Sequence, residues 1–457
     1  MIYRSLIALG LTALHASANL PQTEVDAAAF AGFTNALQQM VEEQSSDYYD
    51  AAQIVLTATQ DECAMDTWME QAAQQKQPAA QLYIANKRIS GILLKQDNAE
   101  AIQEHLNLLK QASDSGYIPA SIYYSTCMNA GLKQVPNKSL ALQILAPAAA
   151  KGNKEARFKW LQLSGRLQSA QDLSRPEVLQ EIDKGNDCVM MYASMLSKDE
   201  DTRIQNLQDA AALGNGDAYY ELGQMVEQVN PKQSYAMMSK AAELHHPNAM
   251  AVIGGIESSP IKADSILDKS GADFKPEEGI KLLRLATMLG SPIAQFELGE
   301  QYLRGNDAIP QDKERAFHHI YRAACSSNAN ALLSYCYMLL VGEGCQADPK
   351  TALGICQELA NRKVLGAELL FAYAHYKGLG VEVNAQRAAE LLEDLAALNQ
   401  PIAYVYLAYI TQAGGVQLKP DPKQAELYLR MAKIDLGDKA QQLYDQLLQA
   451  KDWAFQN

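Results

Sequence analysis

The chain has 457 residues, of which 48% are hydrophobic and 20% are charged, and its formal net charge is −14 at pH 7. This acidic balance argues against a nucleic-acid partner, because binding a phosphate backbone needs a basic face. Runs of β-branched residues are few and no segment alternates cleanly between polar and apolar positions, so the composition favours an all-α fold.

A cleaved signal peptide is predicted over residues 1–18. Arg4 supplies a short basic start, an apolar run follows from Leu6 to Leu14, and Ala16-Ser17-Ala18 has the small residues of a cleavage site. The alternative is the apolar start of a buried first helix. No later stretch is long and apolar enough to be expected to span a bilayer, so we predict a periplasmic or secreted protein, cut after Ala18.

Residues 19–75 are predicted to form a helical N-terminal cap region. Ala, Phe and Leu recur at helical spacing from Val25 to Val41, and Ser45-Ser46-Asp47 interrupts that pattern. The region does not align with the repeats that follow it. Terminal repeats of an array need a polar outer face, which is the role we assign to this region.

Residues 76–290 are predicted to form degenerate helical repeats. Ala218, Ala249 and Ala294 occupy one equivalent position, but they are separated by 31 and 45 residues. These spacings indicate one shortened unit and one insertion. The insertion lies near 257–275, a stretch rich in Ser, Pro, Asp and Gly that is typical of a loop.

Residues 291–438 contain four clear helix-pair units, and residues 439–457 are predicted to form a capping helix and tail. Two sets of alanines and one of glycines repeat every 36 or 37 residues. The sets are Ala294, Ala331, Ala367, Ala403 and Ala440; Ala316, Ala352, Ala388 and Ala425; and Gly305, Gly342, Gly378 and Gly414. One helix pair buries too little surface to be stable alone, so the period indicates a stacked array that forms one body.

Local signals support this division into helix pairs. Asp348-Pro349, Asp421-Pro422 and Asn230-Pro231 each place a side-chain acceptor at the N-cap and a proline at the first position of a second helix. Cys336 and Ala372 hold one equivalent position on the first helix, where a small side chain lets the second helix come close.

The array resembles a known family. The segment QFELGEQY at 295–302 and the turn YKGLGV at 376–381 are similar to the first helix and the glycine turn of Sel-one-like repeats (SLR), a branch of the tetratricopeptide-like α-solenoids. The resemblance implies an all-α, right-handed α-solenoid of stacked antiparallel helix pairs. It also implies adaptor roles, including assembly of envelope complexes such as exopolysaccharide-secretion machinery, or host-directed interaction.

The chain has seven cysteines, which in an oxidising compartment invite disulfides. Cys336 lies nine residues before Cys345 in the turn and Cys356 lies eleven residues after it, so antiparallel helices could bring the two level. Cys336 and Cys356 are therefore the candidate disulfide. The alternative is that each is a small buried hydrophobic residue, since other units carry apolar or small residues at both positions.

The sequence carries no recognisable catalytic or metal-binding pattern. H-E-x-x-H, C-x-x-C and G-x-S-x-G are all absent. The pairs His245-His246 and His318-His319 are adjacent in sequence, and neighbours on a helix point about 100° apart, which disfavours chelation of one ion. We therefore predict no enzyme, no catalytic residue, no metal site and no cofactor.

One repeated feature has a possible functional interpretation. Tyr337, Tyr373 and Tyr409 are 36 residues apart and hold one equivalent position on successive first helices, which Glu300 fills in the unit before. First helices usually line the concave face of an α-solenoid, so these four residues are the candidate partner-binding stripe, for a peptide or a glycan. The alternative is that the rings pack into the next unit as repeat core.

These patterns predict an exported scaffold or adaptor that binds other proteins, envelope components among them. The resemblance also supplies an alternative, because some cysteine-rich secreted relatives are linked to binding or hydrolysing β-lactam compounds. That alternative would make the chain a secreted ligand-binding or hydrolytic protein. A third interpretation, a purely structural spacer, predicts no binding partner.

Overall fold

The computed structural model describes residues 27–93, 99–132, 135–258, 275–326, 328–362 and 364–450. Three predicted features lie wholly or mostly outside these ranges: the signal peptide over 1–18, the insertion near 257–275 and the tail after residue 450.

Backbone contacts divide the chain into two compact units. The first comprises Met1–Gln301 with Asn306–Ile309, and the second comprises Tyr302–Gly305 with Pro310–Asn457. The repeat period predicted one body. It could not predict the division, because a period carries no information about how many contacts cross each junction between helix pairs. The two units are described separately below.

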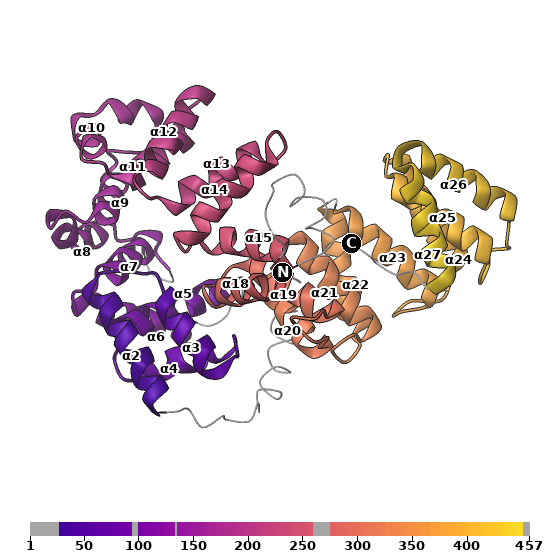
Figure 1. Ribbon diagram of the computed structural model, residues 1–457, viewed down its shortest axis with the longest axis horizontal. Coiled ribbons are helices and arrows are strands. Elements are labelled where there is room, and N and C mark those ends of the chain that lie inside the picture. The colour runs from indigo at the N-terminus through magenta and orange to yellow at the C-terminus, as the bar shows by residue number, and fades with distance from the viewer. Residues whose placement is uncertain are drawn as a thin grey trace. The chain divides into compact units, whose positions relative to one another are not determined.

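The first unit is built from α-helices of uneven length, from 8 to 16 residues, and a 3₁₀-helix of 5 residues. They are α2 (Ala27–Glu42), α3 (Tyr49–Thr59), α4 (Ala64–Gln74), α5 (Pro78–Leu93), α6 (Ala99–Asp114), α7 (Ile118–Ala130), α8 (Lys138–Ala150), α9 (Lys154–Ser164), the 3₁₀-helix η1 (Ala170–Ser174), α10 (Pro176–Asp183), α11 (Asp187–Leu196), α12 (Glu200–Ala212), α13 (Gly216–Val226), α14 (Pro231–Glu243), α15 (Pro247–Ser258) and α18 (Pro276–Met288). Each helix packs mainly against its neighbours in sequence, as Figure 1 shows.

The second unit is much more regular. Helix α19 (Pro292–Arg304) begins in the first unit and ends in the second. The remaining helices are α20 (Lys313–Cys325), α21 (Ala329–Val341), α22 (Pro349–Asn361), α23 (Leu365–Lys377), α24 (Ala385–Ala397), α25 (Pro401–Ala413), α26 (Pro422–Leu436) and α27 (Asp438–Ala450). All of these except α26 have 13 residues. Pairs of equal helices can stack with the same contacts from one unit to the next.

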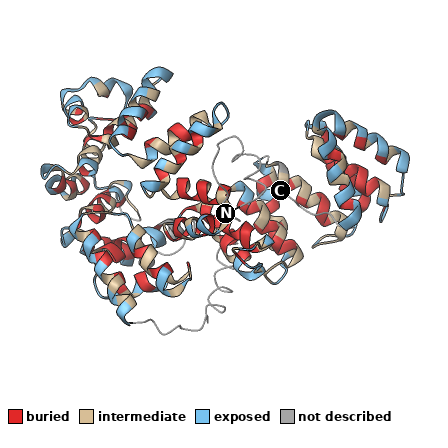
Figure 2. Ribbon diagram, viewed as in Figure 1, coloured by how far each residue is buried: buried red, intermediate tan, exposed pale blue. Residues whose placement is uncertain are grey.

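The expected all-α fold of stacked helix pairs is confirmed. Within the described ranges there is no β-strand, and the two isolated bridges join Asn306 to Ile309 and Gly415 to Leu418. Buried residues line the sides of helices that face other helices, while exposed residues occupy the loops and outer sides (Figure 2).

The alanine sets form the contacts between helices, as the sequence predicted. All five alanines of the first-helix set, from Ala294 to Ala440, are fully buried, and those of the second-helix set are at most 1% exposed. Ala120, Ala156, Ala218 and Ala249 are fully buried in the first unit as well. A methyl group at these points lets two helix backbones approach closely, and a larger side chain would force them apart.

The turns and caps also follow the sequence. Gly305, Gly342, Gly378 and Gly414 all have φ between 70° and 75°, the left-handed region that favours glycine. The Asp348 side chain accepts a hydrogen bond from the Thr351 backbone N–H at 3.1 Å, and Asp421 and Asn230 cap their helices in the same way.

The N-terminal helices of the first unit contact helices that lie far along the chain. Helix α3 packs against α18. The His245 ring stacks on the Tyr49 ring at 3.7 Å, and its Nδ1 lies 2.7 Å from the Asp47 carboxylate. Arg284 lies on α18 and Glu62 lies just after α3, and Arg284 Nε is 3.5 Å from Glu62 Oε2. The predicted cap region therefore packs against later repeats of its own unit.

Candidate protein-binding surface

The predicted tyrosine stripe lies on three successive first helices of the second unit. Tyr337 is on α21, Tyr373 on α23 and Tyr409 on α25. Tyr373 and Tyr409 are only 3% and 5% exposed and belong to the core of this unit, whereas Tyr337 is half-buried at its edge. This burial fits the packing alternative for Tyr373 and Tyr409, while partner binding at the stripe stays a prediction that depends on Tyr337.

The rings of the stripe are linked by aromatic contacts. Tyr337 and Tyr373 have ring centroids 6.1 Å apart at an interplanar angle of 38°, and Tyr409 meets Tyr376 edge-on at 6.2 Å. Such pairs stabilise beyond the area they bury. Glu300, the fourth member of the equivalent position, lies on α19 and is buried at 9% exposure.

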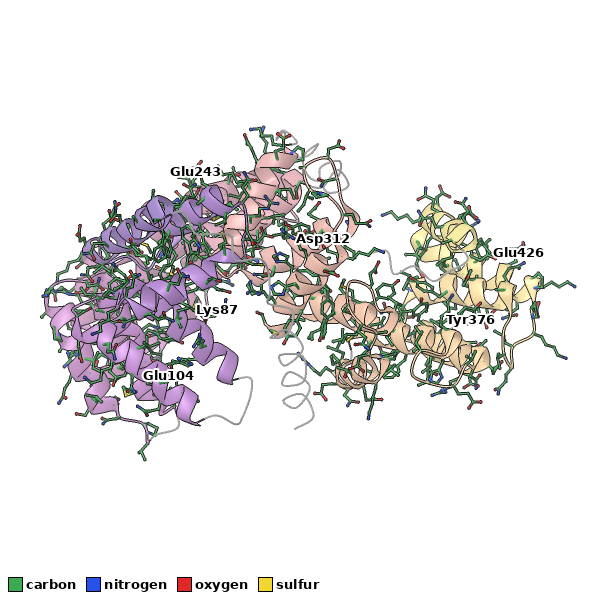
Figure 3. All side chains as sticks on the ribbon, turned by 90° about the horizontal axis from the view of Figure 1, so that it is seen from below. Lys87, Glu104, Glu243, Asp312, Tyr376 and Glu426 are labelled. Atoms are coloured by element: carbon green, nitrogen blue, oxygen red, sulfur yellow. The ribbon has the colours of Figure 1, made fainter. Side chains whose placement is uncertain are left out.

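Half-buried tyrosines that the period did not single out lie at the surface of the same unit. Tyr376, Tyr404 and Tyr428 pack on the core but keep part of their surface accessible, and Figure 3 labels Tyr376 on α23. The Tyr404 and Tyr428 rings stack at 6.2 Å. The Tyr428 hydroxyl donates to Glu393 Oε1 at 2.7 Å. Burial, followed by that hydrogen bond, raises the pKa of Tyr428, so its hydroxyl stays protonated and a donor.

The sequence could have revealed this second group only by composition. Tyr404 directly follows Ala403 of the alanine set and Tyr428 follows Ala425 by three residues, but neither position is a tyrosine in the other three clear units between residues 291 and 438. A feature that occurs once among those units leaves no periodic signal.

The structure brings the two candidate disulfide cysteines together. Cys336 on α21 and Cys356 on α22 are both fully buried, and both are free thiols here. A hydrogen bond between the two thiols, together with burial, raises the pKa of Cys336 well above its ordinary value. A buried thiol that stays protonated is a poor nucleophile, so Cys336 is not expected to react in this state.

Metal and membrane features are absent from the parts of the chain that the structure describes. These parts contain no group of three or more His, Cys, Asp or Glu side chains placed to hold a metal ion. Their helices are all too short or too polar to cross a membrane. Of the predicted histidine pairs, His319 is buried and stacks on Tyr302 at 5.6 Å, and His246 stacks on Tyr220 at 4.5 Å. These contacts are packing contacts.

Comparison with known proteins now identifies the repeat. The Sel1 repeat pattern matches six segments, at residues 120–153, 209–246, 292–328, 327–362, 365–399 and 401–433. The last four adjoin one another over the region where the alanine period is strictest, and the first two lie in the degenerate region.

A solved structure of similar fold shows the same architecture. A protective antigen of uropathogenic Escherichia coli strains that displays an SLR fold superimposes with a TM-score of 0.50, at 17% identity over 92% of this chain and 91% of that one. A Sel1 repeat protein from Oxalobacter formigenes is 21% identical over 66% of this chain and 89% of its own, with a TM-score of 0.38. At such identities the likeness to the antigen speaks for the fold alone.

One curated protein is similar over a short stretch. Chitin synthase regulatory factor 4 of Schizosaccharomyces pombe is 29% identical over 114 residues, which is 24% of this chain and 16% of that protein. The matched repeats, the buried alanine positions and the likeness to the SLR-fold antigen agree with one another. The chain is a Sel1 repeat protein, a scaffold of TPR-like helix pairs with the SLR fold.

Proposed function

We propose that this chain is an exported scaffold that binds other proteins of the bacterial cell envelope and holds them in an assembly. The observation that carries the proposal is the group of half-buried tyrosines on the second unit, formed by Tyr337, Tyr376, Tyr404 and Tyr428. Their rings rest on the helix core, and so a partner would meet aromatic surface that is already fixed in place.

Tyrosine suits this role for two physical reasons. It offers a large apolar area with few rotatable bonds, so little conformational entropy is lost when a partner covers it. Its hydroxyl then satisfies polar groups at the rim of the contact. Tyr428 is additionally held by Glu393 and by the Tyr404 ring, which orders this pair before any partner arrives.

The envelope location rests on the N-terminal sequence, and assembly or secretion complexes such as exopolysaccharide export are the roles that fit it. Host-directed interaction would use the same surface. A secreted ligand-binding or hydrolytic role, of the kind linked to β-lactams, is kept as the competing outcome in the test below.

Affinity capture from an envelope extract tests the proposal. The mature chain from residue 19 serves as bait beside two variants, Tyr404→Ala and Tyr406→Phe. Tyr404 is half-buried at the surface, whereas Tyr406 is only 2% exposed in the core, so its change keeps the ring and alters the interior alone. We expect a specific envelope protein that Tyr404→Ala weakens by about tenfold and Tyr406→Phe leaves unchanged.

Two results would overturn the proposal. One is the absence of any specific partner together with hydrolysis of a β-lactam probe by the purified chain. The other is a partner that both variants retain equally at matched thermal stability, which would remove the tyrosine surface from the proposal.

A further inference from the structure

The first unit contains a cavity that the tyrosine surface does not include. It has a volume of about 350 Å³ and lies between α8, α9 and α10. Its origin is the short second helix of this helix pair: the 3₁₀-helix η1 and the eight-residue α10 follow α9, where other pairs have a second helix of about 13 residues. A shorter helix covers less of α8 and α9, and the uncovered part becomes the cavity.

The apolar side of the cavity is lined by small residues and one large ring. Ala146, Ala149 and Ala150 of α8 face Trp160 and Leu161 of α9. Ala146 and Ala150 are exposed, so this side is open to solvent. Since alanine methyl groups fill little space, the side chain of another molecule can enter between α8 and the tryptophan.

Trp160 is fixed before anything binds. Its ring packs against two core clusters, one around Leu145 and the other around Leu167. On one face it carries the Arg166 guanidinium, 4.9 Å from the ring centroid. An aromatic side chain held in this way loses little freedom on binding, which is typical of residues that dominate the energy of an interface.

The charged groups in the wall already have partners within the chain. Glu181 binds Arg157 at 2.6 Å and accepts from the Asn186 amide at 3.1 Å. Although burial opposes its ionisation, these hydrogen bonds hold the pKa of Glu181 below its ordinary value. Glu177 lies 3.7 Å from Arg166.

Because each carboxylate is matched by a cation, the wall offers no net charge to attract an ion. A charged occupant would lose its hydration without gaining a partner. The neutral balance and the alanine and tryptophan surface fit an uncharged apolar group. At the rim, the exposed Gln180 amide and the Arg157 guanidinium, which also donates to the Ala149 carbonyl at 2.9 Å, can bind backbone carbonyls.

We infer that this cavity is a second docking site, which takes a bulky uncharged side chain such as Leu, Phe or Trp from a segment of a partner protein. The inference deepens the proposed scaffold function and rests on it. It places a contact in the degenerate region, at the point where the second helix of a pair is short, and it gives that short helix a function.

The test measures binding of defined peptides to the full chain. The probes are blocked pentapeptides of the form acetyl-Gly-Ser-X-Ser-Gly-amide in which X is Leu, Phe, Trp, Lys or Glu. With the alanine methyl groups ¹³C-labelled, nuclear magnetic resonance reports directly on Ala146, Ala149 and Ala150. We expect the Leu, Phe or Trp peptides to shift these three signals, and the Lys and Glu peptides to bind at least about tenfold more weakly.

A matched pair of variants separates filling the cavity from disturbing a helix. Ala150 and Ala397 are both exposed and are the last residues of second-type helices, α8 and α24, but only Ala150 lines the cavity. Ala150→Leu is expected to weaken the apolar peptides by about tenfold, and Ala397→Leu by less than about twofold. Equal effects of the two variants, or absence of the shifts in the native chain, overturn the inference.

The capture experiment distinguishes this inference from the broader proposal. If an envelope partner is captured and Ala150→Leu retains it fully, the docking site is overturned and the scaffold function stands. If no partner is captured although the apolar peptides bind in the cavity, the scaffold function fails and the cavity is a ligand site. A dimer of the chain that Ala150→Leu dissociates would replace the partner protein by a second copy and overturn the inference.

Discussion

The two units differ in how they obtain stability from the same kind of repeat. The second unit stacks helices of nearly constant length, and four adjacent Sel1 segments between residues 292 and 433 cover it and its entry helix. The first unit has α-helices of 8 to 16 residues and only two Sel1 matches, at 120–153 and 209–246. Both bury the alanines of the repeat, and the first also has polar contacts between residues up to 198 positions apart in sequence.

This difference teaches how a repeat can diverge without losing its fold. Where each unit matches the next, small side chains and glycine turns at fixed spacing hold the stack by nearest-neighbour contacts. Where units vary in length, those contacts become uneven. In the first unit, the α3–α18 contact with its ion pair, and the separate stack of the Tyr49 ring on His245 after α14, supply part of what the irregular stacking lacks.

The largest effect is expected at a glycine turn of the regular unit. Gly344 has φ of 70°, and a Cβ there would overlap the carbonyl oxygen of Lys313 in the preceding helix pair. Gly344→Ala therefore adds a backbone clash to the cost of a left-handed alanine, and we expect a loss of about 2–5 kcal/mol in the free energy of unfolding, measured by urea denaturation.

The matched control lies in the irregular unit. Gly152 has φ of 90°, and a Cβ there would meet nothing within 4 Å. Gly152→Ala should therefore cost only about 1–2 kcal/mol, the price of the left-handed conformation itself. Equal losses in the two variants would contradict the close packing of turns against the neighbouring pair in the second unit.

The glycine turns belong to the part of the fold that could be predicted from sequence. A left-handed turn or a close helix contact accepts very few residue types. Glycine at the position of Gly342 and alanine at the position of Ala331 therefore recur at a fixed spacing, which can be seen in a single sequence. The Asp348 cap is equally local, since its acceptor and donor are three residues apart.

The rest depends on residues that are distant in sequence. The Asp47–His245 contact joins positions 198 residues apart, and one sequence contains no signal that pairs them. The sequence left open whether Tyr373 is buried, because burial is decided by side chains of the neighbouring helices, and Tyr337 at the same repeat position is only half-buried. For the same reason the cavity beside Trp160 required the structure.

The second-largest effect concerns the cysteine pair of the regular unit. In an oxidising compartment Cys336 and Cys356 are expected to lose two protons and two electrons to a disulfide-forming oxidant and become linked. Since both thiols are buried and Cys336 has a raised pKa, the bond should form before folding is complete. The link should stabilise the chain by about 3 kcal/mol, as judged by unfolding with and without reductant.

Mass spectrometry of the protein isolated from the envelope under thiol-blocking conditions decides whether the bond exists. Modification of both thiols after unfolding would rule out the disulfide and leave the pair as packed hydrophobic residues. The variant Cys356→Ala separates loss of the bond from loss of packing. With reductant present neither protein has the disulfide, so the difference in the free energy of unfolding between the variant and the native chain reports only the lost packing around Cys356.

The next effect tests the long-range contact of the first unit. Arg284→Met keeps the length of the side chain but removes the Arg284 charge from beside the Glu62 carboxylate, whose side chain is 1% exposed. Breaking a buried ion pair by removing one partner is costly, and we expect a loss of about 2 kcal/mol because Arg284 itself is partly accessible.

Its control is an ion pair of the regular unit. Arg387 and Glu390 lie 3.0 Å apart and are both about half exposed, so Arg387→Met should change the free energy of unfolding by less than about 0.5 kcal/mol. If both substitutions cost equally little, the contact between α3 and α18 does not compensate for irregular stacking, and the comparison of the two units fails at this point.

The smallest effect concerns the 3₁₀-helix η1, which directly precedes the short helix α10. Asp172 in η1 accepts hydrogen bonds from the Gln168 and Ser169 backbone N–H groups, each at 3.0 Å, and from Arg175 Nε at 2.7 Å. These bonds, led by that from Gln168, lower the pKa of Asp172 to about 2. The carboxylate is therefore favoured in the folded chain, and its contribution to stability is present above the ordinary pKa of aspartate and is lost as the pH falls through about 2.

Asp172→Asn removes this dependence, because an amide does not titrate. We expect the variant to have a lower thermal midpoint than the native chain at pH 6, with a gap that narrows from about pH 4 downward and closes near pH 2. The matched control is Asp183→Asn, at the exposed end of α10. A gap that stays constant to pH 2 would mean that the hydrogen bonds of η1 do not depend on the charge of Asp172, and that the turn is held by the packing of Leu167 and Val178 alone.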